Sequence, residues 1–141
     1  MTTSKNISIT VEATVNAPAS KVWKLWSSPE HITKWYNASE EWHTPHAEND
    51  LREGGKFLST MAAKDGSASF DFTGVYDAVK ENELISYTLA DGRKVKIIFE
   101  SIGNTTKVTE TFDTETENSI ELQRSGWQAI LDSFKNYVQT N

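Results

Sequence analysis

The stretch from residue 54 to residue 113 alternates apolar and polar residues, and short turn signals interrupt this alternation at intervals. Alternation with a period of two is typical of β-strands that bury one face, because successive side chains point to opposite sides of a sheet. The interruptions are pairs that favour a tight turn, namely Asp65-Gly66, Glu81-Asn82, Asp91-Gly92 and Gly103-Asn104. Strands joined by short turns pair with their neighbours along the chain, so this pattern predicts an antiparallel meander.

The residues before this stretch predict one more strand and then two short helices. Ile7–Asn16 shows the same alternation, with one apolar and one polar face. Pro18 and Pro29 are both followed by helical patterns, and proline is tolerated in the first turn of a helix, so we expect two short helices, the second extending through Trp35. Asn37–Glu53 has no clear period, and we expect a loop there with at most a short strand.

Ser119–Val138 carries the longest helical pattern of the chain. Its apolar side chains fall on one wide stripe, which includes Ile120, Trp127, Ile130, Leu131, Phe134 and Val138. An antiparallel sheet with one solvated face must cover its other face, and this is the only predicted element long enough to do so. We therefore predict an α+β domain in which a curved antiparallel sheet of six to seven strands wraps around a long C-terminal helix, with two short helices after the first strand.

Length and composition narrow the class of protein. A chain of 141 residues suits a single domain spanning residues 1–141, and the absence of cysteine excludes disulfides and thiolate chemistry. The formal net charge of −6 argues against a surface that binds nucleic acid. No apolar run approaches the ~18 residues of a membrane span and the N-terminus lacks a signal-peptide core, so we expect a cytoplasmic protein. We expect it to be a monomer or a weak homodimer.

Three motifs resemble those of a known family. Residues 17–23 read Ala-Pro-Ala-Ser-Lys-Val-Trp, residues 50–57 read Asp-Leu-Arg-Glu-Gly-Gly-Lys-Phe, and residues 126–131 read Gly-Trp-Gln-Ala-Ile-Leu. In this order they are similar to the "APxxxVW", "D-x-R-x-G-G-x-F" and "G-W-x-x-x-L" motifs of the family named after the activator of the heat-shock protein 90 ATPase. That family lies in the START and birch-pollen-allergen superfamily, also called SRPBCC, and the likeness covers nearly the whole chain.

The resemblance implies a helix-grip fold and several possible functions. Members of the superfamily bind lipids, steroids or polyketides, and a few catalyse cyclisation. The resemblance therefore implies a small apolar or amphipathic molecule as the partner, and a chaperone as a candidate protein partner. Because fold does not determine function, the site has to be argued from its own residues.

The chain is rich in aromatic residues, with five Trp, four Tyr and six Phe. Such rings either fill a core or line a ligand pocket. Small residues on the predicted strands, such as Ser59, Gly74 and Ala78, leave volume opposite the rings and favour a cavity between the sheet and the C-terminal helix. The candidate lining residues that periodicity turns toward this interface are Trp35, Phe57, Met61, Phe70, Phe72, Tyr87, Phe99, Trp127, Leu131 and Phe134.

Two polar residues join this candidate site. Glu110 lies between two apolar residues on a strand face that is predicted to be buried, where a carboxylate is costly unless it is paired, hydrogen-bonded or protonated. Glu110 is open to three interpretations: it pairs with Arg124, it contacts the polar end of a ligand, or a bulge turns it outward. Gln123 lies near Trp127 on the predicted helix, at the inner edge of its buried face.

Other chemistry finds little support in the sequence. His43 and His46 have a spacing that occurs in metal sites, but Pro45 between them breaks any helix that would align the two rings, and we expect a solvated loop without a metal. We expect no cofactor and no nucleophilic catalysis, since no G-x-S-x-G motif occurs.

The leading hypothesis is that the protein binds a small hydrophobic or amphipathic ligand in a cavity between the sheet and the C-terminal helix. One alternative is a chaperone-regulator-like protein-interaction module, which predicts an exposed apolar patch. Another is a polyketide cyclase-like or hydrolase-like enzyme, in which Glu110 and a histidine face each other inside the cavity.

Overall fold

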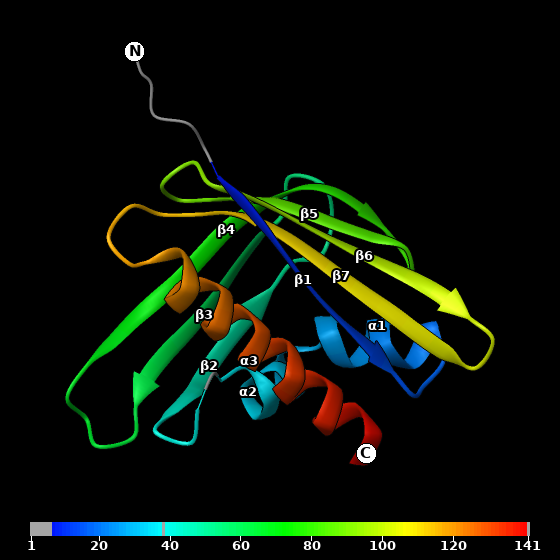
Figure 1. The fold of residues 1–141 in the computed structure, drawn as a ribbon, viewed down its shortest axis with the longest axis horizontal. Coiled ribbons are helices and arrows are strands. Elements are labelled where there is room, and N and C mark those ends of the chain that lie inside the picture. Colours follow the sequence, from blue (N-terminus) through cyan, green and yellow to red (C-terminus); the bar gives the residue numbers. More distant parts are fainter. Residues whose placement is uncertain (1–6, 38, 141) are drawn as a thin grey trace.

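Seven antiparallel strands form one curled sheet in the computed structural model, which describes residues 7–37 and 39–140 (Figure 1). The strands are β1 (Ser8–Val15), β2 (Trp42–Asn49), β3 (Lys56–Ala63), β4 (Ser69–Lys80), β5 (Leu84–Leu89), β6 (Lys94–Ile102) and β7 (Thr105–Asp113). Their order in the sheet is β1-β7-β6-β5-β4-β3-β2, so every pair except β1 and β7 joins neighbours along the chain. The predicted meander is therefore confirmed.

Three described helices complete the predicted α+β helix-grip fold, and they are α1 (Ala19–Ser27), α2 (Pro29–Trp35) and α3 (Ile120–Thr140). Pro18 precedes α1 and Pro29 opens α2, as the sequence predicts. The side-chain oxygen of Ser119 accepts a hydrogen bond of 3.1 Å from the N–H of Leu122 and caps the start of α3. Within the described ranges, none of the helices is long and apolar enough to cross a membrane.

Strand β2 is the main departure from the sequence prediction, because a full strand of eight residues stands where we expected at most a short one. Pro45 interrupts the alternation that would have indicated it. The register of β2 against β3 shifts between His43 and His46, so an irregularity in the pairing accommodates the proline, which has no N–H to donate. The strand tolerates this because it lies at an edge of the sheet.

Gly74 in β4 does not leave the empty volume that the small residues predicted. A Cβ at this position would lie 2.6 Å from a ring carbon of Phe57 and 2.9 Å from the carbonyl oxygen of Thr88. The Phe57 ring therefore already occupies the space above the glycine. Room for a ligand has to come from another part of the concave face.

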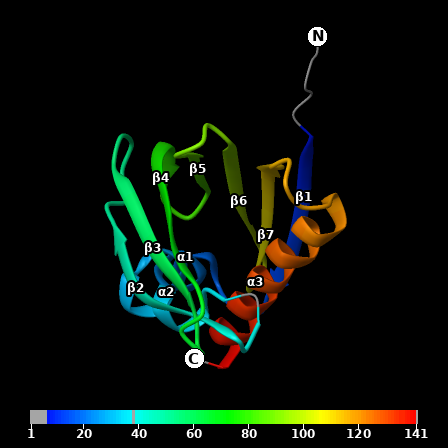
Figure 2. The same cartoon turned by 90° about the vertical axis from the view of Figure 1, so that its left-hand side faces the viewer.

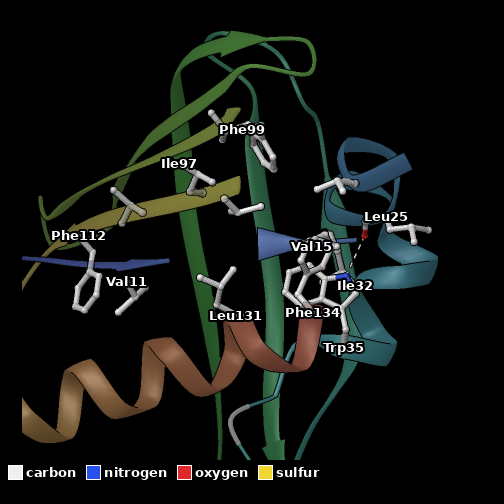
Figure 3. Close-up of a cluster of buried hydrophobic side chains, with 14 of the residues drawn as sticks. Val11, Val15, Leu25, Ile32, Trp35, Ile97, Phe99, Phe112, Leu131 and Phe134 are labelled. Carbon is white, nitrogen blue, oxygen red and sulfur yellow. Dashed lines mark hydrogen bonds between the residues drawn. The ribbon is translucent and has the colours of Figure 1, made fainter. Parts of the chain in front are cut away.

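One part of the apolar core lies between the sheet, α1, α2 and the C-terminal half of α3 (Figure 3). The ring of Phe134 packs edge-on against Trp26 and Trp35, with ring centroids 4.8 and 4.7 Å away. The indole N–H of Trp35 donates a hydrogen bond of 2.9 Å to the carbonyl oxygen of Leu25, so this buried polar group is satisfied. We call this region, formed by Trp26, Trp35, Phe99, Leu131 and Phe134, the closed end.

Candidate functional site

An open cleft lies between the N-terminal half of α3 and strands β3 and β4, which stand on opposite sides of the concave face (Figure 2). Its volume is about 290 Å³. Apolar side chains form most of its wall, and they are Met61, Phe70, Phe72, Leu122, Trp127 and Ile130. Arg93, Glu115 and Gln123 add polar groups to its lining. We call this hollow the outer cleft.

The apolar side chains at the mouth of the outer cleft are largely open to solvent. Phe70 is 52% exposed and Leu122 is 59% exposed. Trp127 lies deeper, where its ring stacks on Phe112 with centroids 4.0 Å apart and planes only 8° from parallel. Large exposed apolar side chains beside a hollow are typical of a binding surface.

A smaller hollow, the inner cavity, lies behind the outer cleft. Its volume is about 40 Å³. The residues around it come from α1, α2, β2, β3, β4 and β5, and they include Trp26, Tyr36, Asn49, Phe57, Ser59, Phe72, Tyr76, Ile85 and Tyr87. Tyr36 and Phe72 also line the outer cleft, and their ring centroids are 6.2 Å apart. These two rings therefore form the boundary between the two spaces.

Glu110 lies on the concave face of β7, between Val11 of β1 and Ile97 of β6 in the sheet register. Its side chain is buried, with 4% of the residue exposed, and within residues 7–37 and 39–140 no hydrogen bond or ion pair reaches its carboxyl group. Burial raises the pKa of Glu110 from its ordinary value of 4.5 to about 8, because an apolar environment disfavours the charged form. At neutral pH the group is therefore mostly a neutral acid that can donate a hydrogen bond.

The structure rules out two of the three interpretations of Glu110. An outward bulge is wrong, because the side chain belongs to the regular buried face of β7. Pairing with Arg124 is also wrong, because Arg124 is exposed and lines a surface groove beside Glu121 and Gln128. Contact with the polar end of a ligand is the interpretation that stays open.

Two tyrosine side chains lie close enough to Glu110 to sense its charge. Burial raises the pKa of the Tyr36 hydroxyl far above its ordinary range, and the nearby Glu110 carboxylate raises it further. The pKa of the Tyr87 hydroxyl is also raised, first by burial and then by Tyr36 and Glu110. The three groups thus form one cluster of neutral hydrogen-bonding groups beneath the concave face.

Gln123 is buried, and its amide group is engaged by backbone atoms. Its oxygen accepts a hydrogen bond of 2.9 Å from the N–H of Glu115, and its nitrogen donates to the carbonyl oxygens of Glu115 and Asn118. These bonds fix the segment that leads from β7 into α3. Gln123 therefore borders the outer cleft, but its amide group holds the wall of the cleft in place through these three bonds.

The structure divides the other predicted lining residues between the cleft, the cavity and the core. Met61, Phe70, Phe72 and Trp127 lie at the outer cleft, and Phe57, Phe72, Tyr87 and Trp35 lie at the inner cavity. Phe99, Leu131 and Phe134 line neither hollow and pack in the closed end (Figure 3). Periodicity identified the buried face correctly but does not tell which part of it is hollow.

Several residues at the site have no place among the sequence-predicted lining residues. Tyr36 follows α2 directly and belongs to no periodic pattern, so nothing in its spacing indicated its position at the boundary. Ser59 in β3 and Tyr76 in β4 both lie on the inward face of their strand, which the alternation did indicate. The Tyr76 hydroxyl donates a hydrogen bond of 2.5 Å to Asn49, a partner that only the unexpected strand β2 brings into place.

The histidines do not form the pair with Glu110 that the enzyme hypothesis predicted. Nδ1 of His31 lies 2.6 Å from the hydroxyl of Tyr137, and Nε2 of His46 lies 2.7 Å from a carboxylate oxygen of Glu48. His43 is exposed on the edge strand β2. In the part of the chain that the structure describes, no three His, Asp or Glu side chains gather as a set that could hold a metal ion.

Comparison with known families agrees with the motifs in the sequence. Residues 16–139 match the family described as "Activator of Hsp90 ATPase homolog 1-like protein". The chain belongs to this family. The resemblance drawn from the three motifs is therefore confirmed, and with it the place of the chain in the SRPBCC superfamily.

Several solved structures share the fold of this chain, and two of them also share much of its sequence. The solution NMR structure of the AHSA1-like protein from Aeromonas hydrophila is 44% identical, with a TM-score of 0.89 over 95% of this chain and 93% of that chain. A solution structure of a protein from Cytophaga hutchinsonii is 62% identical, with a TM-score of 0.82 over the same shares of the two chains. A crystal structure of a protein from Nitrosomonas europaea, at 18% identity and a TM-score of 0.80 over 94% of each chain, shares the fold. None of the curated proteins matches this chain.

Proposed function

We propose that the protein binds a small hydrophobic or amphipathic molecule in the outer cleft. The observation that carries this proposal is the open hollow of about 290 Å³ with six apolar side chains in its wall. A cavity of about 150 Å³ in another protein already binds benzene, so this volume suits a molecule of two fused rings. Burial of apolar surface, at roughly 25 cal/mol per Å², supplies most of the affinity.

The two most exposed residues of the cleft make the test sharp. Phe70 and Leu122 stand on opposite walls, each is more than half exposed in the free protein, and neither belongs to the buried core. Ile102 provides a matched control, because it is similarly exposed at 53% but lies at the end of β6 and outside the outer cleft.

The experiment is a fluorescence titration with the neutral dye N-phenyl-naphthylamine. We expect saturable binding to the unchanged protein, and a loss of affinity of about fivefold or more in Phe70→Ser and in Leu122→Ser, since each removes about 1 kcal/mol of apolar contact. Ile102→Ser should bind as the unchanged protein does. Equal affinity in all three variants would place the dye elsewhere and remove the outer cleft from the proposal.

The natural ligand needs a separate measurement. Native mass spectrometry of the protein purified from its own host would show a bound molecule as added mass, and extraction would then identify it. We expect this added mass to decrease in Phe70→Ser and to persist in Ile102→Ser.

A protein partner is the second candidate, and the exposure of Phe70 and Leu122 supports it because the apolar patch is open rather than enclosed. The family description names an activator of Hsp90 ATPase, so the partner to test is an Hsp90-type chaperone. If this second function holds, the ATPase rate of the chaperone should rise when the protein is added, and Phe70→Ser should abolish the rise. An unchanged rate leaves small-molecule binding as the better account.

A further inference from the structure

Three of the residues that line the inner cavity carry hydroxyl groups that have no hydrogen-bond partner in the described protein. Tyr36, Ser59 and Tyr87 all line it, and within residues 7–37 and 39–140 no hydrogen bond to any of their side-chain oxygens occurs. Ser59 and Tyr87 are buried, so bulk water does not satisfy them. A buried polar group without a partner costs about 1–3 kcal/mol, and most native proteins leave few of them.

Other polar groups around the same cavity are satisfied. The side-chain oxygen of Asn49 accepts a hydrogen bond from the Tyr76 hydroxyl, and its nitrogen donates a hydrogen bond of 2.6 Å to the carbonyl oxygen of Ser27. The unpartnered hydroxyls are therefore a distinct set within the lining. Such a set requires a guest that can accept and donate hydrogen bonds.

The volumes of the two hollows limit which part of such a guest each hollow can hold. The inner cavity, at about 40 Å³, holds a small polar group or a few water molecules but no ring. The outer cleft, at about 290 Å³, has the room for rings. Because Tyr36 and Phe72 line both hollows, a molecule with its rings in the outer cleft has one end next to the inner cavity.

The charges around the inner cavity argue for an uncharged guest. Lys, Arg and His are absent from its lining in the described chain, and Arg93 at the outer cleft is already paired with Asp91 at 2.7 Å. An anion placed there would find no cation among the lining residues to compensate its charge. A cation would have to give up its hydration while Glu110 is mostly neutral at neutral pH.

We infer that the ligand is an uncharged ring compound that carries a hydroxyl or carbonyl oxygen at one end, with its rings in the outer cleft and its oxygen held by Tyr36, Ser59 and Tyr87. This inference rests on the proposed function, because it describes which molecules the outer cleft selects. It excludes carboxylates such as fatty acids, which an apolar cleft alone would accept.

The test uses four naphthalene derivatives that differ only in the group on one ring carbon: hydroxymethyl, methyl, carboxylate and aminomethyl. Their affinities are measured at neutral pH by isothermal titration calorimetry. We expect the hydroxymethyl compound to bind about tenfold more tightly than the methyl compound, the difference that one or two net hydrogen bonds make. The carboxylate and the protonated amine should both bind more weakly than the hydroxymethyl compound.

Two variants locate the effect. Tyr87→Phe and Ser59→Ala remove a hydroxyl without adding bulk, so both should keep the affinity for the methyl compound and reduce the advantage of the hydroxymethyl compound several-fold. Phe70→Ser is the control at the outer cleft, and it should weaken the methyl and hydroxymethyl compounds by the same factor.

The failure of the inference differs from the failure of the proposed function. If the hydroxymethyl and methyl compounds bind equally, the inner cavity holds only water, and the inference is overturned while binding in the outer cleft stands. Tightest binding of the carboxylate or the amine also overturns it. If none of the four compounds binds, the proposed function fails and the inference fails with it.

Discussion

Leu131 and Phe134 of α3 are fully buried in the closed end, whereas Leu122, about three turns earlier on the same helix, is 59% exposed at the outer cleft. The same sheet underlies both regions. At the closed end, α1 and α2 fill the space between sheet and helix, and at the outer cleft no element does so in the described chain. One amphipathic helix thus serves two purposes: its C-terminal half completes the core, and its N-terminal half forms a wall.

The contrast teaches where stability and binding are located in this fold. The closed end buries its apolar side chains more fully, so the other end can leave rings exposed without unfolding the domain. Glu110 lies between these regions, in a buried row of the sheet but beside the polar groups of the inner cavity. A domain that keeps an unpaired carboxyl group there gives up stability, which is common at functional sites.

The largest expected effect compares the same substitution in the two regions. Phe134→Ala removes a fully buried ring that packs on Trp26 and Trp35, and we expect it to lower the free energy of unfolding by about 3–5 kcal/mol. Phe70→Ala removes a half-exposed ring, and we expect a loss within about 0.5 kcal/mol. Urea unfolding of both variants measures the difference. Similar losses would mean that the two regions are packed alike.

The next effect concerns Glu110 and depends on pH. Because the pKa of Glu110 is raised from 4.5 to about 8 in the folded protein, the folded state holds this proton more tightly than the unfolded state. The contribution of this proton to stability is therefore fully present below pH 4.5 and is lost as the pH rises through about 8. Glu110→Gln removes this titration. The unfolding free energy of the variant, relative to that of the unchanged protein, should therefore increase by a few kcal/mol between pH 4.5 and about 8.

Urea unfolding at a series of pH values checks this prediction, with Glu53→Gln as the control because Glu53 is exposed. We expect the control to follow the unchanged protein at every pH. A difference between Glu110→Gln and the unchanged protein that stays constant from pH 4 to pH 9 would mean that burial does not disfavour the ionised carboxyl group.

The sequence predicts the fold of this protein much better than it predicts the site. Strands β3 to β7 follow from alternation and turn pairs, and α3 follows from its apolar stripe, because both signals are local. The full length of strand β2 was not predicted, because Pro45 breaks the local alternation and the strand forms by pairing with β3. A strand whose own alternation is broken, and which forms only by pairing with a neighbouring strand, leaves no clear local signal.

The site follows the same logic. Glu110 was indicated because a charged residue on an apolar strand face is visible in the sequence, and its burial is confirmed. Phe99, Leu131 and Phe134 share the same periodic signal with the cleft residues but lie in the closed end. Whether a ring fills space or borders a hollow depends on how far α3 lies from β3 and β4, and periodicity carries no information on that distance.

The smallest expected effect concerns two glycines, one with free space around it at the outer cleft and one in close contact with a ring. Gly126 lies inside α3 and lines the outer cleft, and a Cβ added there would meet no atom within 4 Å. Gly126→Ala should therefore raise the free energy of unfolding by about 0.5–1 kcal/mol, because alanine favours a helix interior over glycine. Gly74→Ala is the matched contrast, and it should destabilise, because the new methyl group would overlap the Phe57 ring. Urea unfolding of the two variants should give opposite signs. If Gly126→Ala destabilises instead, the N-terminal half of α3 is packed as tightly as the closed end, and the contrast between the two regions does not hold.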